Sequence, residues 1–243
     1  MNDLAARLTA AEREFGTTNT RPRDAATLIV VDRSQKVPTV LMGRRHPGQR
    51  FMPGKFVFPG GRLERSDAAA PLATPLHPKV EERLRARIPA AAQAKAPALA
   101  AAAIRETAEE TGMLIGVKDP AAVRHSHPAW SLFANHGIAL DLGALHLVAR
   151  AITPPRRPVR FDARFFAADA AAIVHRIDGI VGPDAEFVEL AWVPIAEAKH
   201  YPLPTITQAV LEELEARTAA GFGHDLPVPF YYMRRGRFHR ELI

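Results

Sequence analysis

Short apolar runs separated by polar segments predict a chain that contains both strands and helices. Residues 25–31 form a β-branched apolar run typical of a buried strand. Extended structure is also predicted for five further segments, at 37–42, 51–58, 142–153, 159–166 and 187–193. The predicted helices are 98–111 and 205–220. Because strands and helices do not alternate regularly, we expect a mixed α/β (α+β) sandwich rather than a doubly wound sheet.

Two stretches interrupt this pattern. Residues 68–97 are rich in Ala and Pro, with one charged helical patch at 79–88, and hold too few large apolar residues for a core of their own. We interpret them as an insertion. Residues 119–141 are predicted to form a small, partly helical segment that contains Trp130 and Phe133. The length of 243 residues alone allows one large domain or two small ones.

The amino-acid composition excludes several classes of catalytic and metal site. The chain has no Cys, which excludes disulfides, thiolate catalysis and Cys-ligated metal centres. It carries no apolar run of the roughly 20 residues that cross a bilayer, and residues 1–15 show no apolar signal-peptide centre, so we expect a cytoplasmic protein. The net charge is +6, with 32 basic residues against 26 acidic ones, and 26 of the basic residues are Arg and 6 are Lys. This excess fits a compositional bias, an anionic substrate or nucleic acid.

Three carboxylates are spaced for one helix face. Glu106, Glu109 and Glu110 stand at i, i+3 and i+4, so their side chains rise from the same side of the predicted helix. Oxygen ligands so grouped suit Mg²⁺, which takes carboxylates together with water and phosphate oxygens. The alternative is a solvated acidic face with Arg105 in a surface ion pair.

A second segment lies upstream, where the predicted strand 51–58 is followed by Pro59-Gly60-Gly61. Glycines there allow backbone to approach a ligand, although a plain strand-end turn is the alternative. Together the two segments resemble the Nudix hydrolase signature, in which Gly and Glu are separated by five residues and Arg-Glu-apolar-x-Glu-Glu-x-Gly follows seven residues later. Gly61 fills the first position, Asp67 replaces the expected Glu, and residues 105–112 fill the rest, with Thr107 at the apolar position.

The two halves of this signature are separated by 37 residues, 68–104, instead of seven, so about 30 residues are inserted. A loop absorbs such length at little cost, since closure entropy grows slowly with length. This arrangement favours a single domain over 1–243 with 68–97 looped out. The resemblance is to the branch with a long insertion that includes peroxisomal coenzyme A diphosphatases, and it spans roughly 25–195. That branch's upstream element is met only loosely, by Leu41, Arg44, Arg45, Arg50 and Gly54.

The resemblance implies a Nudix-type α-β-α sandwich with a mixed sheet, and hydrolysis of a nucleoside diphosphate linked to another group X. It also implies that Mg²⁺ or Mn²⁺ is held by the three glutamates with a carbonyl of Gly60 or Gly61, and that Arg105 orients a glutamate. The general base is left open among the signature glutamates and the later acids Asp184, Glu186 and Glu189, of which we favour Glu186. An ordinary loop acid is the alternative for Glu186.

Arginines are the candidates for binding phosphate, namely Arg44, Arg45, Arg50, Arg160 and Arg164. On a strand, Arg160, Asp162 and Arg164 share one face and could equally form a surface ion-pair ladder. Aromatic side chains could stack on a nucleobase, but core packing is the simpler interpretation of Trp130, Phe161 and Phe165.

Several functions compete. Coenzyme A or an acyl derivative is the leading substrate, and ADP-ribose, a nucleotide sugar or a dinucleotide is the alternative. A catalytically silent ligand sensor is disfavoured, because all three signature glutamates are present. Nucleic acid binding is supported only by the basic, aromatic tail 228–243, and a membrane partner is not expected. Dimers are common in the family, so a homodimer is a further expectation.

Overall fold

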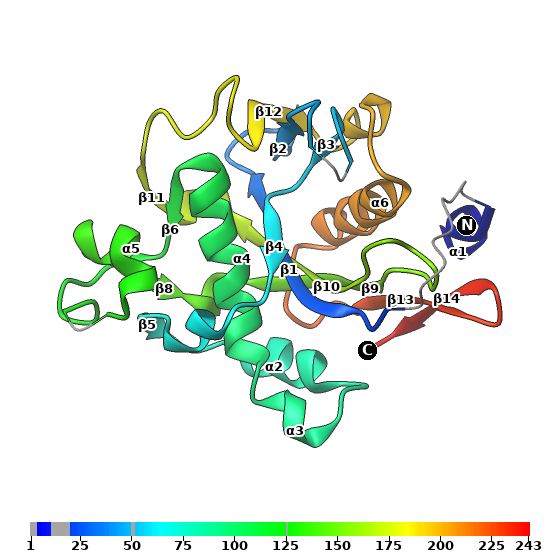
Figure 1. The fold of residues 1–243 in the computed structure, drawn as a ribbon, viewed down its shortest axis with the longest axis horizontal. Coiled ribbons are helices and arrows are strands. Elements are labelled where there is room, and N and C mark those ends of the chain that lie inside the picture. Colours follow the sequence, from blue (N-terminus) through cyan, green and yellow to red (C-terminus); the bar gives the residue numbers. More distant parts are fainter. Residues whose placement is uncertain (1–3, 11–19, 50–51, 125) are drawn as a thin grey trace.

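The computed structural model describes residues 4–10, 20–49, 52–124 and 126–243. At its centre is a nine-stranded mixed sheet in the order β12-β2-β1-β10-β9-β13-β14, with β3 paired to β2 and β4 paired to β1 (Figure 1). Its strands are β1 Arg23–Asp32, β2 Thr39–Arg45, β3 Phe56–Val57, β4 Gly60–Arg62, β9 His146–Ile152, β10 Phe161–Asp169, β12 Phe187–Pro194, β13 Pro229–Arg234 and β14 Arg237–Leu242.

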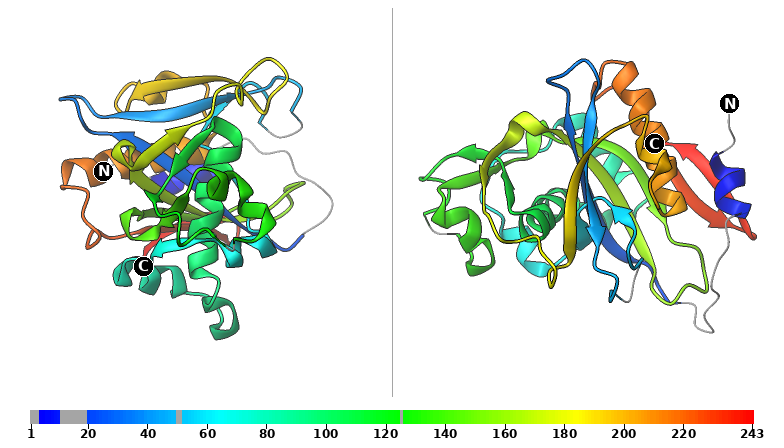
Figure 2. Two further views of the ribbon diagram at one scale, coloured as in Figure 1. Left: turned by 90° about the vertical axis from the view of Figure 1, so that its left-hand side faces the viewer. Right: turned by 90° about the horizontal axis from the view of Figure 1, so that it is seen from above.

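The sheet separates two hydrophobic cores. Along β1, Leu28 and Val30 face one core and Ile29 and Val31 the other, because successive strand residues point to opposite faces. The first core is covered by α4 (Ala96–Thr111) and the second by α6 (Thr205–Ala219), which lie on opposite sides of the sheet (Figures 1 and 2). The helix α1 (Leu4–Ala10) packs beside β14. The predicted mixed α+β sandwich is therefore confirmed.

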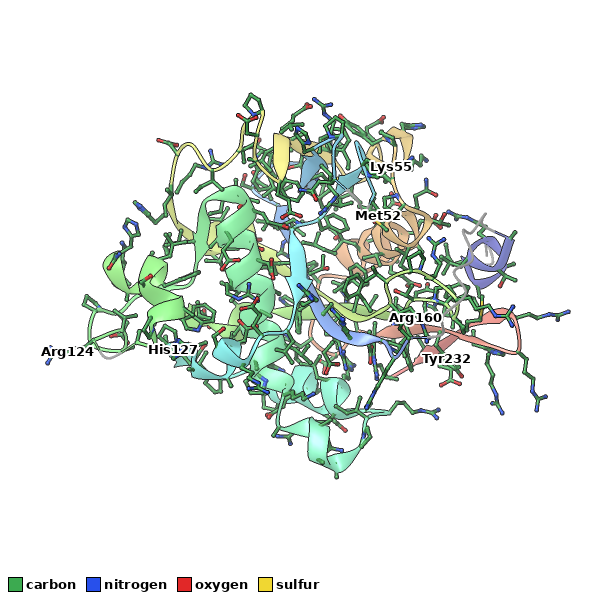
Figure 3. All side chains as sticks on the ribbon, in the orientation of Figure 1. Met52, Lys55, Arg124, His127, Arg160 and Tyr232 are labelled. Atoms are coloured by element: carbon green, nitrogen blue, oxygen red, sulfur yellow. The ribbon has the colours of Figure 1, made fainter. Side chains whose placement is uncertain are left out.

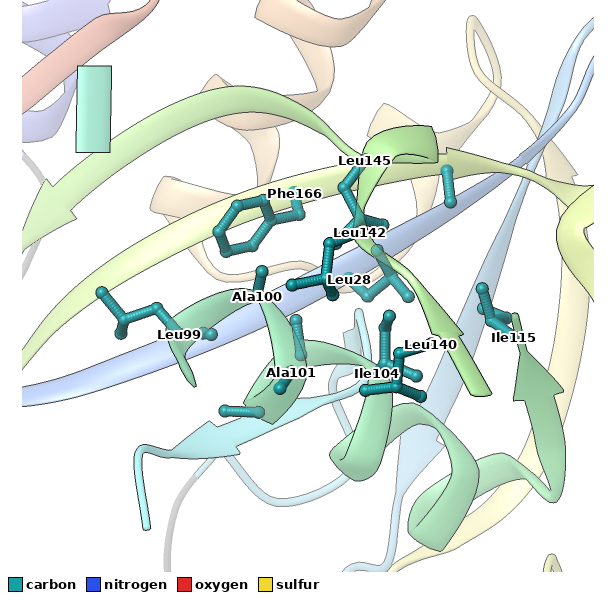
Figure 4. Close-up of a cluster of buried hydrophobic side chains, with 14 of the residues drawn as sticks. Leu28, Leu99, Ala100, Ala101, Ile104, Ile115, Leu140, Leu142, Leu145 and Phe166 are labelled. Carbon is teal, nitrogen blue, oxygen red and sulfur yellow. The ribbon is translucent and has the colours of Figure 1, made fainter. Parts of the chain in front are cut away.

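The helix α4 ends where the sequence indicates. Gly112 adopts a left-handed conformation with φ of 74° and its N–H donates to the carbonyl of Ala108, which closes the helix. The α4 core is dense in small side chains, and Ala100, Ala101 and Ile104 of α4 share it with Phe166 and Leu140 (Figure 4). Because alanine side chains are small, α4 approaches the sheet closely. The C-terminal part of this helix is therefore held at a fixed distance from β1 and β4.

The predicted insertion and the 119–141 segment pack together. The insertion contains β5 (Leu72–Thr74), α2 (Pro78–Arg85) and α3 (Ala90–Gln93), and β5 runs parallel to β8 (Ile138–Asp141), which also pairs with β7 (Val117–Lys118). The 119–141 segment adds the short helix α5 (Ser131–Asn135). Large side chains from both segments join the α4 core: Leu76, Val80, Leu84, Trp130, Phe133 and Leu140. The insertion is thus part of the packing around α4.

Some element boundaries differ from the predictions. The strand predicted at 142–153 begins at His146, because Leu142–Ala144 form a 3-10 turn. Within 51–58 the described strand is β3 alone, since Met52 and Gly54 take positive φ and turn the chain. The tail 228–243 forms the hairpin β13–β14, and β11 (Ile173–Arg176) pairs with β6 (Met113–Ile115) outside the main sheet. In the described residues no helix is long and apolar enough to span a membrane.

Three histidines from distant segments form a stack. His77 before α2, His224 after α6 and His146 at the start of β9 lie in order, with both neighbouring pairs of ring centroids 4.0 Å apart and nearly parallel. Burial, with added repulsion from His224, lowers the pKa of His146 to about 3. The folded state therefore favours the neutral His146 ring.

We expect this stack to make the fold sensitive to acid. An unfolded His titrates near pH 6.5, so the unfolded chain binds a proton first and the stability contribution of His146 is lost as pH falls from about 6.5 toward 3. Wild type should lose about 1–2 kcal/mol more than His146→Phe between pH 7 and pH 5, allowing for partial solvent exposure of the ring. Urea unfolding at both pH values measures this. His200→Phe, at an exposed histidine, is the control, and equal losses in wild type and His146→Phe would contradict the expectation.

Candidate active site

The two glycines bring backbone against α4. Gly60 and Gly61 belong to β4, which pairs antiparallel with β1 opposite Thr27 and Ala26. A Cβ at Gly61 would overlap the carboxylate of Glu106, and one at Gly60 would lie 2.6 Å from the carbonyl oxygen of Ala26. Gly60 therefore requires glycine for close approach of two backbones, whereas a side chain at Gly61 would displace the Glu106 carboxylate.

The guanidinium of Arg105 donates hydrogen bonds to several of these carboxylates. Its side chain is only 5% exposed, and Nη1 donates to Glu106 Oε1 at 2.9 Å and to Glu109 Oε2 at 3.1 Å. Nη2 also donates to the carbonyl oxygen of Arg62 at 3.1 Å, which ties α4 to β4. The guanidinium thus fixes the positions of two glutamates relative to the glycine strand.

Asp67 holds the other edge of this guanidinium. Its carboxylate accepts from Arg105 Nε at 2.8 Å and Nη2 at 3.1 Å, in a bidentate pair, and from the backbone N–H of Glu64 at 2.7 Å. The Asp67 side chain is fully buried. The sequence analysis identified Asp67 only as a replacement for the signature Glu and did not predict this pairing with Arg105. The available signal was its position in the signature, where Asp stands for Glu.

The three signature glutamates gather at the C-terminal part of α4, as predicted. Glu110 is buried and its Oε2 accepts from the backbone N–H of Gly60 at 3.0 Å, whereas the Glu109 side chain is 51% exposed. Burial raises the pKa of Glu106 and Glu109 and raises that of Glu110 well above its usual range, with Glu186 the next cause for Glu110. The folded environment therefore disfavours the ionised form of all three glutamates unless a positive charge compensates.

This donor set fits a divalent cation. As placed, no group of three or more acidic or histidine side chains within the described residues is close enough to hold a metal ion, because Glu106 and Glu109 are turned toward Arg105. Carboxylate oxygens are nevertheless the ligands that Mg²⁺ and Mn²⁺ prefer, and a bound cation would stabilise the ionised form of these glutamates.

Arg45 and Glu186 lie beside the buried end of this cluster. The end of β2 and the start of β12 bring them together, and Arg45 Nη1 donates to Glu186 Oε1 at 2.7 Å. Both charges act on the pKa of Glu110, so the pair lies close to it. Arg44, the preceding residue on β2, points to the opposite face of the strand and pairs with Glu189 at 2.7 Å.

The other predicted phosphate ligands lie elsewhere. Arg164 is 2% exposed and pairs with Asp24 and Asp162, and Asp24 also binds Lys95, immediately before α4. Arg164 therefore forms its ion pairs with these two aspartates rather than with the signature glutamates. This is the ion-pair alternative, with a buried rather than a surface pair.

Arg160 donates to the carbonyl oxygens of Thr153 and Thr20 and lines a pocket that includes Tyr232. Figure 3 shows these two side chains together beside β13 and β14, away from α4. Arg50 lies outside the described residues. Trp130 and Phe165 are buried in the two cores, as the simpler interpretation predicted.

No protein-family model matches the chain, and no curated protein matches it. Among solved structures, a Nudix hydrolase from Alicyclobacillus acidocaldarius is 32% identical with a TM-score of 0.58, over 81% of this chain and 92% of that one. RenU, a Nudix hydrolase from M. smegmatis, is 19% identical with a TM-score of 0.44, over 82% and 86%. The NUDIX domain of Shewanella oneidensis NrtR, solved with ADP ribose, is 12% identical with a TM-score of 0.45, over 90% and 99%. On the first of these similarities, which confirms the predicted family and hydrolase class, the chain belongs to the Nudix hydrolase family.

Proposed function

We propose that the chain is a metal-dependent hydrolase that cleaves the diphosphate linkage of a nucleoside diphosphate bonded to a further group X. The observation that carries this proposal is the cluster of Glu106, Glu109 and Glu110, held by Arg105 against the Gly60–Gly61 strand. Its carboxylates are suited to a cation that also binds diphosphate oxygens.

The position of each residue in this cluster determines the role that we assign to it. The three glutamates would hold Mg²⁺ or Mn²⁺ with a carbonyl of Gly60 or Gly61, and the bound cation would supply charge neutralisation and a more acidic water. Arg105 would keep Glu106 and Glu109 oriented.

Glu186 is our candidate for the general base that accepts the proton of the attacking water. It lies beside Glu110 and is only partly buried, so a water can reach it. Arg45 bonds to Glu186 and is placed to contact a phosphate oxygen of a substrate bound there. Arg44 is directed to the other face of β2, so we assign it no part in this step.

Coenzyme A or acyl-coenzyme A is our leading substrate, supported by the long insertion within the signature and the partial match at Arg44, Arg45 and Gly54. The alternatives are ADP-ribose, a nucleotide sugar or a dinucleotide, and a catalytically silent ligand-sensing domain. A homodimer stays a prediction.

A substrate panel tests the proposal. Purified protein is incubated with coenzyme A, acetyl-coenzyme A, ADP-ribose, a nucleotide sugar, a dinucleotide and capped RNA, each with Mg²⁺, Mn²⁺ or EDTA. We expect cation-dependent hydrolysis that EDTA abolishes, with coenzyme A giving 4′-phosphopantetheine and 3′,5′-ADP by mass spectrometry. Turnover of another member but not of coenzyme A would move the assignment to that class. No turnover of any member, with ligand binding retained, would favour the silent sensor.

A further inference from the structure

A tryptophan outside the signature reaches the chain segment that carries Asp67. Trp130 lies in the 119–141 segment, is fully buried, and donates its indole N–H to the carbonyl oxygen of Ser66 at 3.0 Å. Its ring packs against Phe133, with centroids 5.4 Å apart, within the α4 core. A buried indole N–H needs such a partner, so the bond fixes both ring and carbonyl.

The carbonyl group that accepts this bond belongs to Ser66, the residue before Asp67, and Asp67 pairs with Arg105. Ser66 and Asp67 belong to the 3-10 turn Arg65–Ala69, in which Asp67 accepts the N–H of Glu64. Asp67 in turn forms the bidentate pair with Arg105. Because the peptide between Ser66 and Asp67 is planar and rigid, a shift of the Ser66 carbonyl moves the Asp67 side chain with it.

The long insertion explains why such an anchor is needed. A seven-residue connection would tie Asp67 closely to α4, whereas here 37 residues separate Asp67 from Arg105. The 119–141 segment supplies further anchors at the start of the insertion. Leu140 N–H donates to the carbonyl oxygen of Pro71 at 2.7 Å, and Thr74 bonds to Asp141. The segment therefore braces the chain from Ser66 to Thr74.

We infer that Trp130 is a positioning residue for the active site, acting through the Ser66 carbonyl and Asp67 on Arg105 and hence on Glu106 and Glu109. This inference deepens the proposed function and rests on it for its catalytic consequence. The 119–141 segment then helps to fix the geometry of the active site.

The first test removes the indole N–H together with part of the ring. We expect Trp130→Phe to weaken Mn²⁺ binding, measured by calorimetry without substrate, and to lower kcat, each by about 10-fold, as for outer partners of metal ligands. Hydrogen exchange at Arg105 Nε–H, followed by NMR, should become faster. The control Phe133→Leu disturbs the same core and should lower Tm while leaving Mn²⁺ affinity and this exchange rate unchanged.

A second variant guards against loss of packing or folding. Incorporating benzothienylalanine at position 130 puts sulphur in place of the N–H and keeps the ring shape. Unchanged Arg105 Nε–H exchange and unchanged Mn²⁺ affinity in this variant would overturn the inference. If wild type neither binds Mn²⁺ nor hydrolyses any panel member, the proposed function fails, and Arg105 exchange in the two position-130 variants still decides whether Trp130 positions this residue.

Discussion

Glutamine in place of Glu109 or Glu110 is expected to lower kcat by about 100-fold or more. Each change removes a charged oxygen ligand from the proposed cation site, where charge stabilisation contributes several kcal/mol to catalysis and about 1.4 kcal/mol corresponds to tenfold in rate. Steady-state kinetics with the best substrate of the panel, at saturating Mg²⁺, measures the loss. Glu189→Gln is the matched control, because Glu189 pairs with Arg44 on the other face and should retain activity.

The same substitutions should separate function from stability. Glu110 is buried and accepts a hydrogen bond from the uncharged backbone N–H of Gly60, so its charge is costly to the folded state. Its raised pKa means that ionised Glu110 destabilises the metal-free fold at neutral pH. Glu110→Gln should therefore raise the Tm of EDTA-treated protein while it abolishes activity. Full Mg²⁺-dependent turnover in both glutamine variants would show that the glutamates are not the cation site.

The grouping of acidic side chains at this end of α4 supports the proposed site. Burial raises the pKa of all three signature glutamates, and Glu186 adds to the shift at Glu110, so these carboxylates are costly to the folded state. The glutamates are held in place by Arg105, whose guanidinium reaches two of them, and by the glycine strand, whose N–H at Gly60 reaches the third. Stability is thus supplied by the arginine clamp and by the alanine-rich packing behind it.

Local patterns predicted most of this fold. The alternation along β1 and the helix formers of α4 act over a few residues, so their elements, and the end of α4 at Gly112, follow from the sequence. Contacts between segments that are distant along the chain do not follow from these local patterns. Arg164 was predicted to share a strand face with Asp162, but its pairing with Asp24 depends on the parallel neighbour β1.

The candidate active site shows the same difference between local patterns, which are predictable, and contacts between distant segments, which are not. Spacing alone placed the three glutamates on one helix face, because helical periodicity is a local property. The bond between Asp67 and Arg105 joins residues 38 apart across the insertion, and the bond from Trp130 to Ser66 joins residues 64 apart. Neither has a periodic signal. The core contribution of the insertion was likewise underestimated, since Val80 and Leu84 lie among charged residues in sequence and only the α2 helix gathers them on one side.

Asp67→Asn is expected to lower the free energy of unfolding by about 3–5 kcal/mol, the second large effect. The substitution keeps the shape of the side chain but removes the buried bidentate carboxylate, which leaves Arg105 with its single bonds to Glu106 and the half-exposed Glu109. Breaking a buried ion pair is strongly destabilising. Urea unfolding in the presence of EDTA measures the loss without contributions from bound metal. Asp24→Asn is a control at a half-buried aspartate that also pairs with arginine, and it should cost less.

A double substitution tests whether the loss comes from breaking the buried pair of Asp67 and Arg105. Arg105→Met alone should also be strongly destabilising, because it leaves Asp67 buried and unpaired. Combining it with Asp67→Leu removes both charges, and we expect the double variant to recover much of the stability lost by either single change while remaining inactive. Additive losses in this cycle would contradict a direct coupling between the two side chains. Recovery of stability without activity would assign to this buried pair the orientation of Glu106 and Glu109 as its function.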